Sequence, residues 1–180
     1  MTFSRMNKVN EARGYAYRDG EGEPVKGKRG DKARLGDRMV QRLQGFIAWV
    51  GRRKEWKGWY RGWMVENPVG GLAGRPYMRH WKVRHKLVVV DLCAYGHYYM
   101  KPTHIWTSVM GWQPQGQRAR GDGRCHGRCR MGYMGPKGRW RHYYAMGVES
   151  RKAKGGVGRK EMKQAMPHLL HREVLRAAMR

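Results

Sequence analysis

Cysteine and histidine side chains are the residues of this chain best suited to hold a metal ion. Cys125, His126 and Cys129 lie in one short glycine-rich run, and His142 follows further along. A structural zinc ion normally takes four such ligands. Adjacent Cys125 and His126 are poorly spaced for one ion, and His142 joins them only if the chain folds back. We therefore expect a solvated basic loop here and no bound zinc.

The remaining cysteine, Cys93, ends an apolar run and is expected to be a buried structural residue. Three cysteines do not make an even disulfide framework. This favours a reducing intracellular compartment, the cytoplasm or nucleus.

A carboxylate stands where a strand is expected to end. Residues 63–65 read as a short buried strand, and Glu66-Asn67-Pro68 follow it before a pair of glycines. Pro68 lacks a backbone donor, so the strand should stop there. In open α/β sheets, ligand sites lie just beyond the carboxyl ends of strands. The alternative is a structural carboxylate that pairs with a nearby arginine.

Cations and aromatic rings alternate between residues 112 and 159. The cations are Arg118, Arg120, Arg124, Arg128, Arg130, Lys137, Arg139 and Arg141, and the rings are Trp112, Tyr133, Trp140, Tyr143 and Tyr144. Cations bind phosphates while rings stack on unpaired bases, so this pattern favours nucleic-acid binding over a merely solvated surface.

The charge of the whole chain supports that interpretation. Its 180 residues carry 39 Lys+Arg against 13 Asp+Glu, a formal net charge of +26. Such a charge favours an anionic partner, nucleic acid first and an anionic membrane surface second. No apolar run approaches the roughly 20 residues of a membrane span.

Regular elements can be placed around these residues. An amphipathic helix is predicted over 31–50, capped by Asp31 and closed by a left-handed Gly51. Its expected core face comprises Leu35, Met39, Leu43, Phe46, Ile47 and Val50, with Arg34, Arg38 and Arg42 on a solvated side. Strands are predicted at 63–65, 86–92 and 103–109, the last two forming an antiparallel hairpin, and a final helix begins near Pro167.

Two motifs of the chain resemble motifs of the DNA methyltransferases that modify the 5-position of cytosine. The resemblance is to the phage and viral branch of that family, in which the two motifs occur in the same order as here. The first is Glu66-Asn67-Pro68. The second is Tyr95-Gly96 followed by Lys101-Pro102-Thr103-His104-Ile105-Trp106-Thr107, and Thr2-Phe3-Ser4 resembles the end of the family's Pro-Cys-x-x-Phe-Ser loop. The resemblance covers about residues 2–113.

The resemblance implies a fold and a set of roles. The fold is α/β, an incomplete Rossmann-like class I S-adenosylmethionine-dependent methyltransferase with a terminal antiparallel hairpin and an irregular basic insertion. Glu66 would donate a proton or hydrogen bond to the cytosine ring, Asn67 would position the backbone, and Pro68 would stiffen the turn. Lys101 would lie near the target base or its phosphate. S-adenosylmethionine is the implied cofactor and DNA the implied partner.

The implied organisation has four parts: an exposed loop region at 1–30, a partial catalytic core at 31–113, a basic insertion at 114–158, and a carboxyl-terminal helix at 159–180. The family's nucleophilic cysteine would fall just before Met1, and its cofactor-binding glycine loop would lie further upstream. We therefore expect a partial methyltransferase that is inactive alone, binds DNA through a basic surface and is completed by an upstream polypeptide. Two alternatives stay open: a stand-alone basic nucleic-acid-binding protein without catalysis, and a gene fragment with no selected function.

Overall fold

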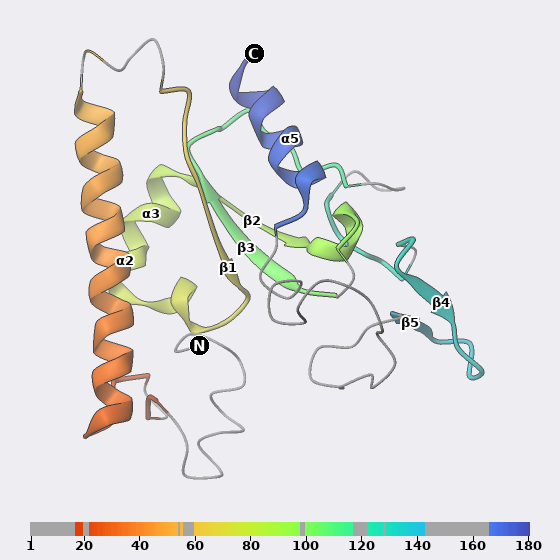
Figure 1. Ribbon diagram of the computed structural model, residues 1–180, viewed down its shortest axis with the longest axis horizontal. Helices are drawn as coiled ribbons and strands as arrows, with labels where there is room; N and C mark the ends of the chain where they lie inside the picture. The colour runs from red at the N-terminus through yellow and green to blue at the C-terminus, as the bar shows by residue number, and fades with distance from the viewer. Residues whose placement is uncertain are drawn as a thin grey trace, which may run out of the picture. The chain divides into compact units, whose positions relative to one another are not determined.

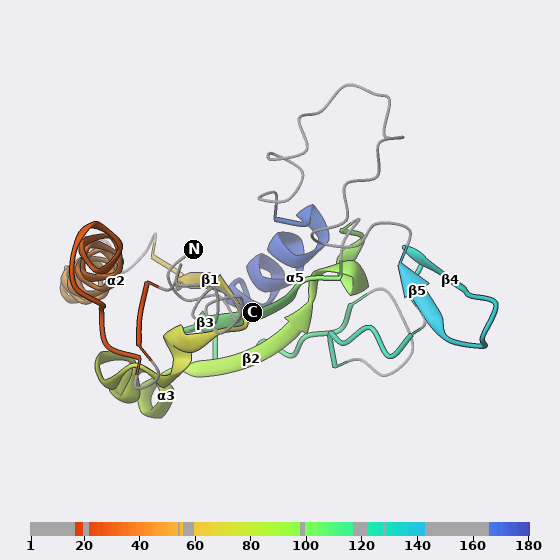
Figure 2. The same ribbon diagram turned by 90° about the horizontal axis from the view of Figure 1, so that it is seen from below.

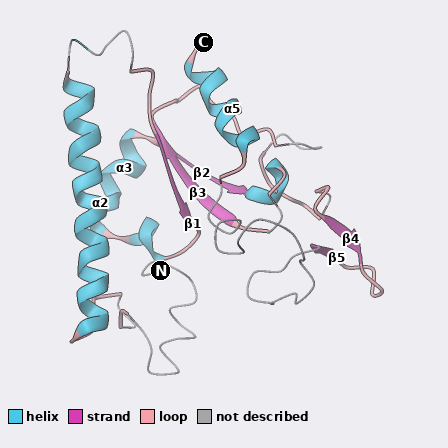
Figure 3. Ribbon diagram, in the orientation of Figure 1, coloured by secondary structure: helices cyan, strands magenta, loops and turns pink. Residues whose placement is uncertain are grey.

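The computed structural model describes residues 17–19, 22–53, 55, 60–97, 100–116, 122–127, 129–142 and 166–180. The chain divides into two compact units. The first comprises Met1–Lys86 with Trp106–Ser108, and the second comprises Leu87–Ile105 with Val109–Arg180. Helices and strands both occur, so the protein is mixed α/β, as the sequence predicts (Figure 1, Figure 3).

Helix α2 of the first unit spans Lys28–Arg52 and extends beyond the predicted range at both ends. It begins after Gly27, whose φ of 78° is left-handed backbone that favours glycine. Asp31 is not the cap; it lies in the first turn and accepts a 2.7 Å hydrogen bond from Arg34. The expected cap at Gly51 is also wrong, because Gly51 is helical and the extended Arg53 ends the helix.

The inward face of α2 differs from the one that hydropathy predicts. Ala33 and Val50 are buried, and Asp37, Val40, Gln44 and Ile47 between them are half-buried. Four residues of the expected core face are exposed: Leu35 by 50%, Met39 by 62%, Leu43 by 37% and Phe46 by 57%. The helix is therefore rotated so that Asp37, not the leucines, faces its unit.

Four side chains, which we call the Asp37 network, account for that rotation. Arg18 donates to Asp37 Oδ1 at 2.8 Å, Tyr77 donates to the same oxygen at 2.6 Å, and Arg75 lies 3.5 Å from Oδ2. Burial alone would raise the pKa of Asp37. The hydrogen bonds from Tyr77 and Arg18 and the charges of Arg18 and Arg75 outweigh it, so the pKa is lowered.

The segment before α2 is not exposed throughout, contrary to the expectation for residues 1–30. Arg18 is buried, and it also donates to the carbonyl oxygens of Ala33 and Gly22, each at 3.2 Å. Arg75 donates to the Gly22 carbonyl as well. The two guanidinium groups therefore tie this segment to α2. Residues 1–16, with Thr2-Phe3-Ser4 and Tyr15, lie outside the described residues.

Three strands form one sheet in the order β1-β3-β2. They are β1 (Met64–Pro68), β2 (Lys86–Asp91) and β3 (Pro102–Thr107), which confirms the three predicted strands with shifted ends. β2 and β3 are joined through residues 92–101, and the Leu92 N–H donates to the Lys101 carbonyl at 3.2 Å. A connection this short makes the pair antiparallel, as predicted. Within β2, Val90 and Asp91 are buried, and the four residues before them are half-buried.

Short helices follow β1 and β2. η2 (Gly71–Gly74), η3 (Pro76–Met78) and α3 (Arg79–Arg84) come after β1, and η4 (Leu92–Tyr95) comes directly after β2. In the first unit Trp81 of α3 is buried against Trp63, with ring centroids 4.6 Å apart.

The second unit adds a small hairpin and a final helix. β4 (Gly132–Met134) and β5 (Trp140–His142) pair antiparallel, where the sequence predicts little regular structure (Figure 2). α5 (His168–Ala178) buries Leu170 and Val174 but leaves Leu175 62% exposed, and Pro167 caps its start, near where the sequence predicts a final helix to begin. None of the described helices combines the length and the apolar character needed to cross a lipid bilayer.

Candidate metal and nucleic-acid sites

Three cysteines and one histidine of the second unit meet at one point. Cys93 belongs to η4 just after β2, Cys125 and Cys129 lie in the loop before β4, and His142 ends β5. Their four ligand atoms all lie within 4.8 Å of one another. We call Cys93, Cys125, Cys129 and His142 the cysteine–histidine cluster.

The cluster is shielded from solvent. Cys93 is fully buried, Cys125 and Cys129 are each 6% exposed, and Met131 and Trp140 pack against the three sulfurs. The Cys125 Sγ lies 3.3 Å from the His142 Nε2. Burial raises the pKa of the Cys93 thiol, and the neighbouring Cys125 and Cys129 raise it further, while burial lowers the pKa of His142. An ion that prefers sulfur and nitrogen would find its ligands converging here.

A tight turn brings the two loop cysteines together. His126 and Gly127 both have positive φ angles, 47° and 65°. A Cβ on Gly127 would lie 3.1 Å from the Trp140 Cβ, so the turn passes close over that ring. Asp91 lies at the end of β2. Its carboxylate accepts a 3.0 Å hydrogen bond from the Cys125 N–H and forms a 3.1 Å ion pair with Arg124. The turn is therefore anchored to the strand that leads into Cys93.

The ligand set differs from the one that the sequence run suggests. His126 is not in the cluster; its Nε2 lies 2.6 Å from the Asp122 carboxylate. Cys93 belongs to the cluster instead. His142 lies in it as well, because β5 folds back against β4. The expectation of a solvated loop is wrong at Cys125 and Cys129, since both are buried. No local spacing pattern signals Cys93, although its position at a strand end could have raised it as a candidate.

The face of the β4–β5 hairpin that does not carry His142 is basic. In the register of the two strands Tyr133 lies opposite Arg141, while Met134 lies opposite Trp140. Directly opposed residues share a face, and alternate residues of one strand share it too. Tyr133, Arg139 and Arg141 therefore form one exposed face, the hairpin face, and Trp140 and His142 belong to the other.

The other predicted nucleic-acid contacts divide into three groups. Arg130 and Lys137 are exposed beside the hairpin. Arg124 is committed to the ion pair with Asp91. Arg118, Arg120 and Arg128 lie outside the described residues, as do Tyr143 and Tyr144.

The motif Glu66-Asn67-Pro68 lies within β1 rather than beyond its end. The Asn67 side chain donates a 2.7 Å hydrogen bond to the Pro68 carbonyl, and the Glu66 Oε2 atom is buried. Lys101 is buried in the second unit, where its backbone carbonyl accepts bonds from the Leu92 N–H and, at 3.0 Å, the Thr103 hydroxyl. Lys101 is therefore no part of an exposed cationic surface.

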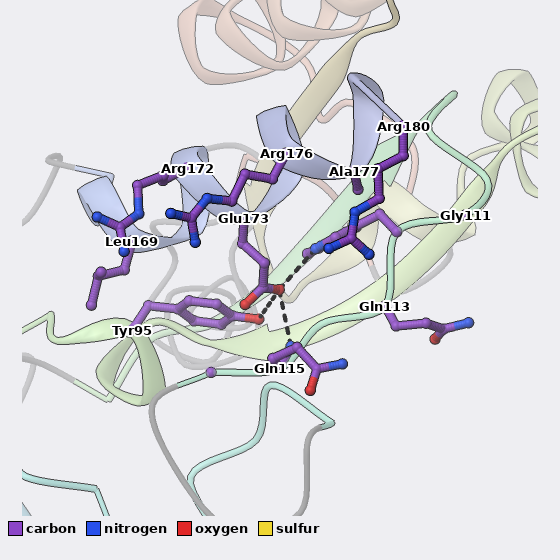
Figure 4. A pocket seen from close by; sticks show the side chains of 12 residues that line it. Tyr95, Gly111, Gln113, Gln115, Leu169, Arg172, Glu173, Arg176, Ala177 and Arg180 are labelled. Carbon is purple, nitrogen blue, oxygen red and sulfur yellow. Dashed lines mark hydrogen bonds between the residues drawn. The ribbon is translucent and has the colours of Figure 1, made fainter.

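A groove beside α5 is built around one carboxylate (Figure 4). The Glu173 Oε1 accepts hydrogen bonds from the Trp112 indole at 2.8 Å, the Gln115 N–H at 2.9 Å and the Tyr95 hydroxyl at 3.3 Å. Arg172, Arg176 and Arg180 line the same groove.

Comparisons with known proteins leave the family open. No family model matches the chain, and neither a curated protein nor a solved structure shows significant similarity to it.

Proposed function

We propose that the protein binds nucleic acid, DNA in the first place, through the hairpin face of Tyr133, Arg139 and Arg141. The supporting observation is the register that sets Tyr133 directly opposite Arg141 on an exposed surface. A ring beside guanidinium groups offers a base a stacking partner and a phosphate a charge-assisted donor. Exposed Arg130 and Lys137 extend the same basic region.

The net charge of +26 supplies the long-range part of this recognition. Cations that neutralise phosphates release condensed counterions, so affinity falls as salt rises. Contacts of this kind fix orientation on the backbone without reading sequence. The hairpin face therefore suits binding that tolerates many sequences.

The test compares two variants that lose the same charge. Arg139→Gln/Arg141→Gln removes two cations of the hairpin face, and Arg38→Gln/Arg42→Gln removes two exposed cations of α2. Kd for a labelled duplex is measured by fluorescence anisotropy at several salt concentrations. Loss of two phosphate contacts should make the fall of log K with log salt shallower. The magnitude of the slope should decrease by about 1.8 in the hairpin variant, at roughly 0.9 per contact.

The α2 variant should change that slope by much less. An equal change in both variants would mean that charge alone, and not the hairpin face, binds the duplex. Binding by the native chain that does not depend on salt would contradict the proposal altogether.

We also propose, from the two sequence motifs, that the chain is part of a DNA cytosine methyltransferase with an incomplete Rossmann-like core. The Asn67 side chain bonded to the Pro68 carbonyl supports the positioning role implied for Asn67. The neighbouring strands β2 and β3, joined by a short connection, support the hairpin that the resemblance implies. No catalytic step follows from the described residues.

Under this second proposal, the chain by itself has no methyltransferase activity. The purified protein is incubated with duplex DNA and labelled S-adenosylmethionine, and incorporated label is counted. We expect none above the level of a Glu66→Gln control. Incorporation that disappears in the control would show an active enzyme and would overturn the expected inactivity.

A further inference from the structure

We propose that Cys93, Cys125, Cys129 and His142 bind one Zn²⁺ ion in a closed tetrahedral site. The four ligand atoms lie within 4.8 Å of one another. A tetrahedral zinc ion, with bonds of about 2.3 Å to sulfur and 2.0–2.1 Å to nitrogen, holds its ligand atoms roughly 3.6–3.8 Å apart. Small side-chain movements are therefore enough to close the site.

The donor set selects the metal. Three sulfurs and one imidazole nitrogen in a compact group suit zinc, whereas Mg²⁺ and Ca²⁺ require oxygen ligands. An iron–sulfur cluster spreads its cysteines over several iron atoms, which needs more widely separated sulfurs than this arrangement provides. All four positions are filled by protein side chains, and this is the mark of a structural rather than a catalytic zinc site.

Two features around the cluster favour a ligand site over an ordinary core of buried thiols. The imidazole of His142 enters a group of three sulfurs with its Nε2 3.3 Å from Cys125 Sγ, although a purely apolar core gains nothing from a polar ring. The Asp91 carboxylate holds the backbone of Cys125, as outer partners of metal ligands do.

The ion would join parts of the second unit that are distant in sequence. Cys93 follows β2, Cys125 and Cys129 precede β4, and His142 ends β5. β4 and β5 are short, and an isolated two-stranded hairpin is marginally stable in water. Zinc binding would therefore supply folding free energy to residues 125–142.

The test measures metal in the full chain. Protein produced with zinc and then desalted should contain about one zinc per chain by mass spectrometry. Replacing zinc with Co²⁺ should give the visible absorption of a tetrahedral thiolate site. Native protein with neither zinc nor this spectrum would overturn the proposal.

Three variants distinguish the ligand set. Cys93→Ser and His142→Gln should bind Co²⁺ and Zn²⁺ at least about 100-fold more weakly, beyond the 10–100-fold that loss of an outer partner costs. His126→Gln is the matched control and should retain full affinity, because His126 pairs with Asp122. Loss of metal in His126→Gln with retention in His142→Gln would place the ion on the local run and contradict the site.

A measurement on the native chain keeps the test decisive if a variant does not fold. Alkylation of the three cysteines should be slow with zinc and fast after a chelator. A disulfide would instead protect two cysteines until a reductant is added, and a chelator would have no effect. That second pattern would overturn the proposal.

Discussion

In the first unit one carboxylate meets two guanidinium groups and a phenol, whereas in the second unit three thiols and an imidazole meet. The Asp37 network contains both signs of charge, and its hydrogen bonds join its own members. The cysteine–histidine cluster contains only groups that donate electron pairs to a metal. The first arrangement is complete as protein, while the second has the donor set of the zinc site proposed above.

Replacing Asp37 should give the largest effect. Asp37→Asn leaves two largely buried guanidinium groups facing a neutral amide, because Arg18 and Arg75 are only 5% and 10% exposed in their side chains. Breaking a buried pair in this way costs about 3 kcal/mol of unfolding free energy. Urea denaturation with and without a chelator measures it, and the loss should be the same in both.

Tyr77→Phe is the milder control for that experiment, since it removes one hydrogen bond and leaves the charges in place. It should cost about 1–2 kcal/mol. If the loss in Asp37→Asn disappeared with the chelator present, the two regions would not be independent and the comparison would fail.

The sheet and α2 show how far sequence alone reaches. β2 and β3 are predictable because each contains apolar or β-branched residues in one local run, whereas β1 is predictable only at its apolar start and continues through Glu66-Asn67-Pro68. The rotation of α2 was not, because Asp37 meets Arg18 and Arg75, which lie far from it in sequence. Hydropathy favours the side with Leu35, Met39, Leu43 and Phe46, whereas the ion pairs turn the side with Ala33, Asp37 and Gln44 inward; the predicted and observed faces share Ile47 and Val50.

The second region shows the same limit for a site. Cys125 and Cys129 were visible as candidates, and His142 was named as a ligand that required the chain to fold back. Cys93 is predicted to be a buried structural residue because it ends an apolar run, and its burial is confirmed. Its role depends on β2 ending beside the turn at Gly127, and only the tertiary structure shows that.

An intermediate effect is expected at the turn of the metal cluster. Gly127→Ala places a Cβ 3.1 Å from Trp140 on backbone with a φ of 65°. The left-handed backbone costs an L residue about 1–2 kcal/mol at either position, and at Gly127 the contact with Trp140 adds to that cost beside the ligands. We therefore expect Zn²⁺ affinity to fall at least about fivefold in Gly127→Ala. Competition with a chromophoric chelator measures it.

Gly138→Ala is the matched control, because Gly138 has a φ of 64° and no heavy atom within 4 Å of the added Cβ. It should weaken the hairpin without disturbing the ligands, and Zn²⁺ affinity should change less than in Gly127→Ala. Equal losses in both variants would mean that backbone strain in the hairpin, not the turn over Trp140, governs the site.

The smallest expected effect is the pH dependence of the first unit. The pKa of Asp37 is lower in the folded chain than its ordinary value near 3.8, since its hydrogen bonds and the arginine charges outweigh burial. A lowered pKa contributes stability that is present above the unfolded value and is lost as pH falls through the folded one. The unfolding free energy attributable to Asp37 should therefore decline only below about pH 4.

Measuring native protein and Asp37→Asn together with a chelator, from pH 6 to pH 3, isolates that contribution. The difference between their unfolding free energies should shrink as the pH falls toward 3. A gap that stayed constant down to pH 3 would show that the charge of Asp37 does not stabilise the network.

Successive side chains of β5 lie on opposite faces of the hairpin, and this restricts where residues can be inserted or deleted. Arg139 and Arg141 point to one side of the strand and Trp140 and His142 to the other. Inserting or deleting one residue within β5 would exchange the two sets, carrying arginines toward the sulfurs and the imidazole out to solvent. Insertions and deletions should therefore be accepted in the turn at 135–138, where strand parity is unaffected, and rejected within residues 139–142.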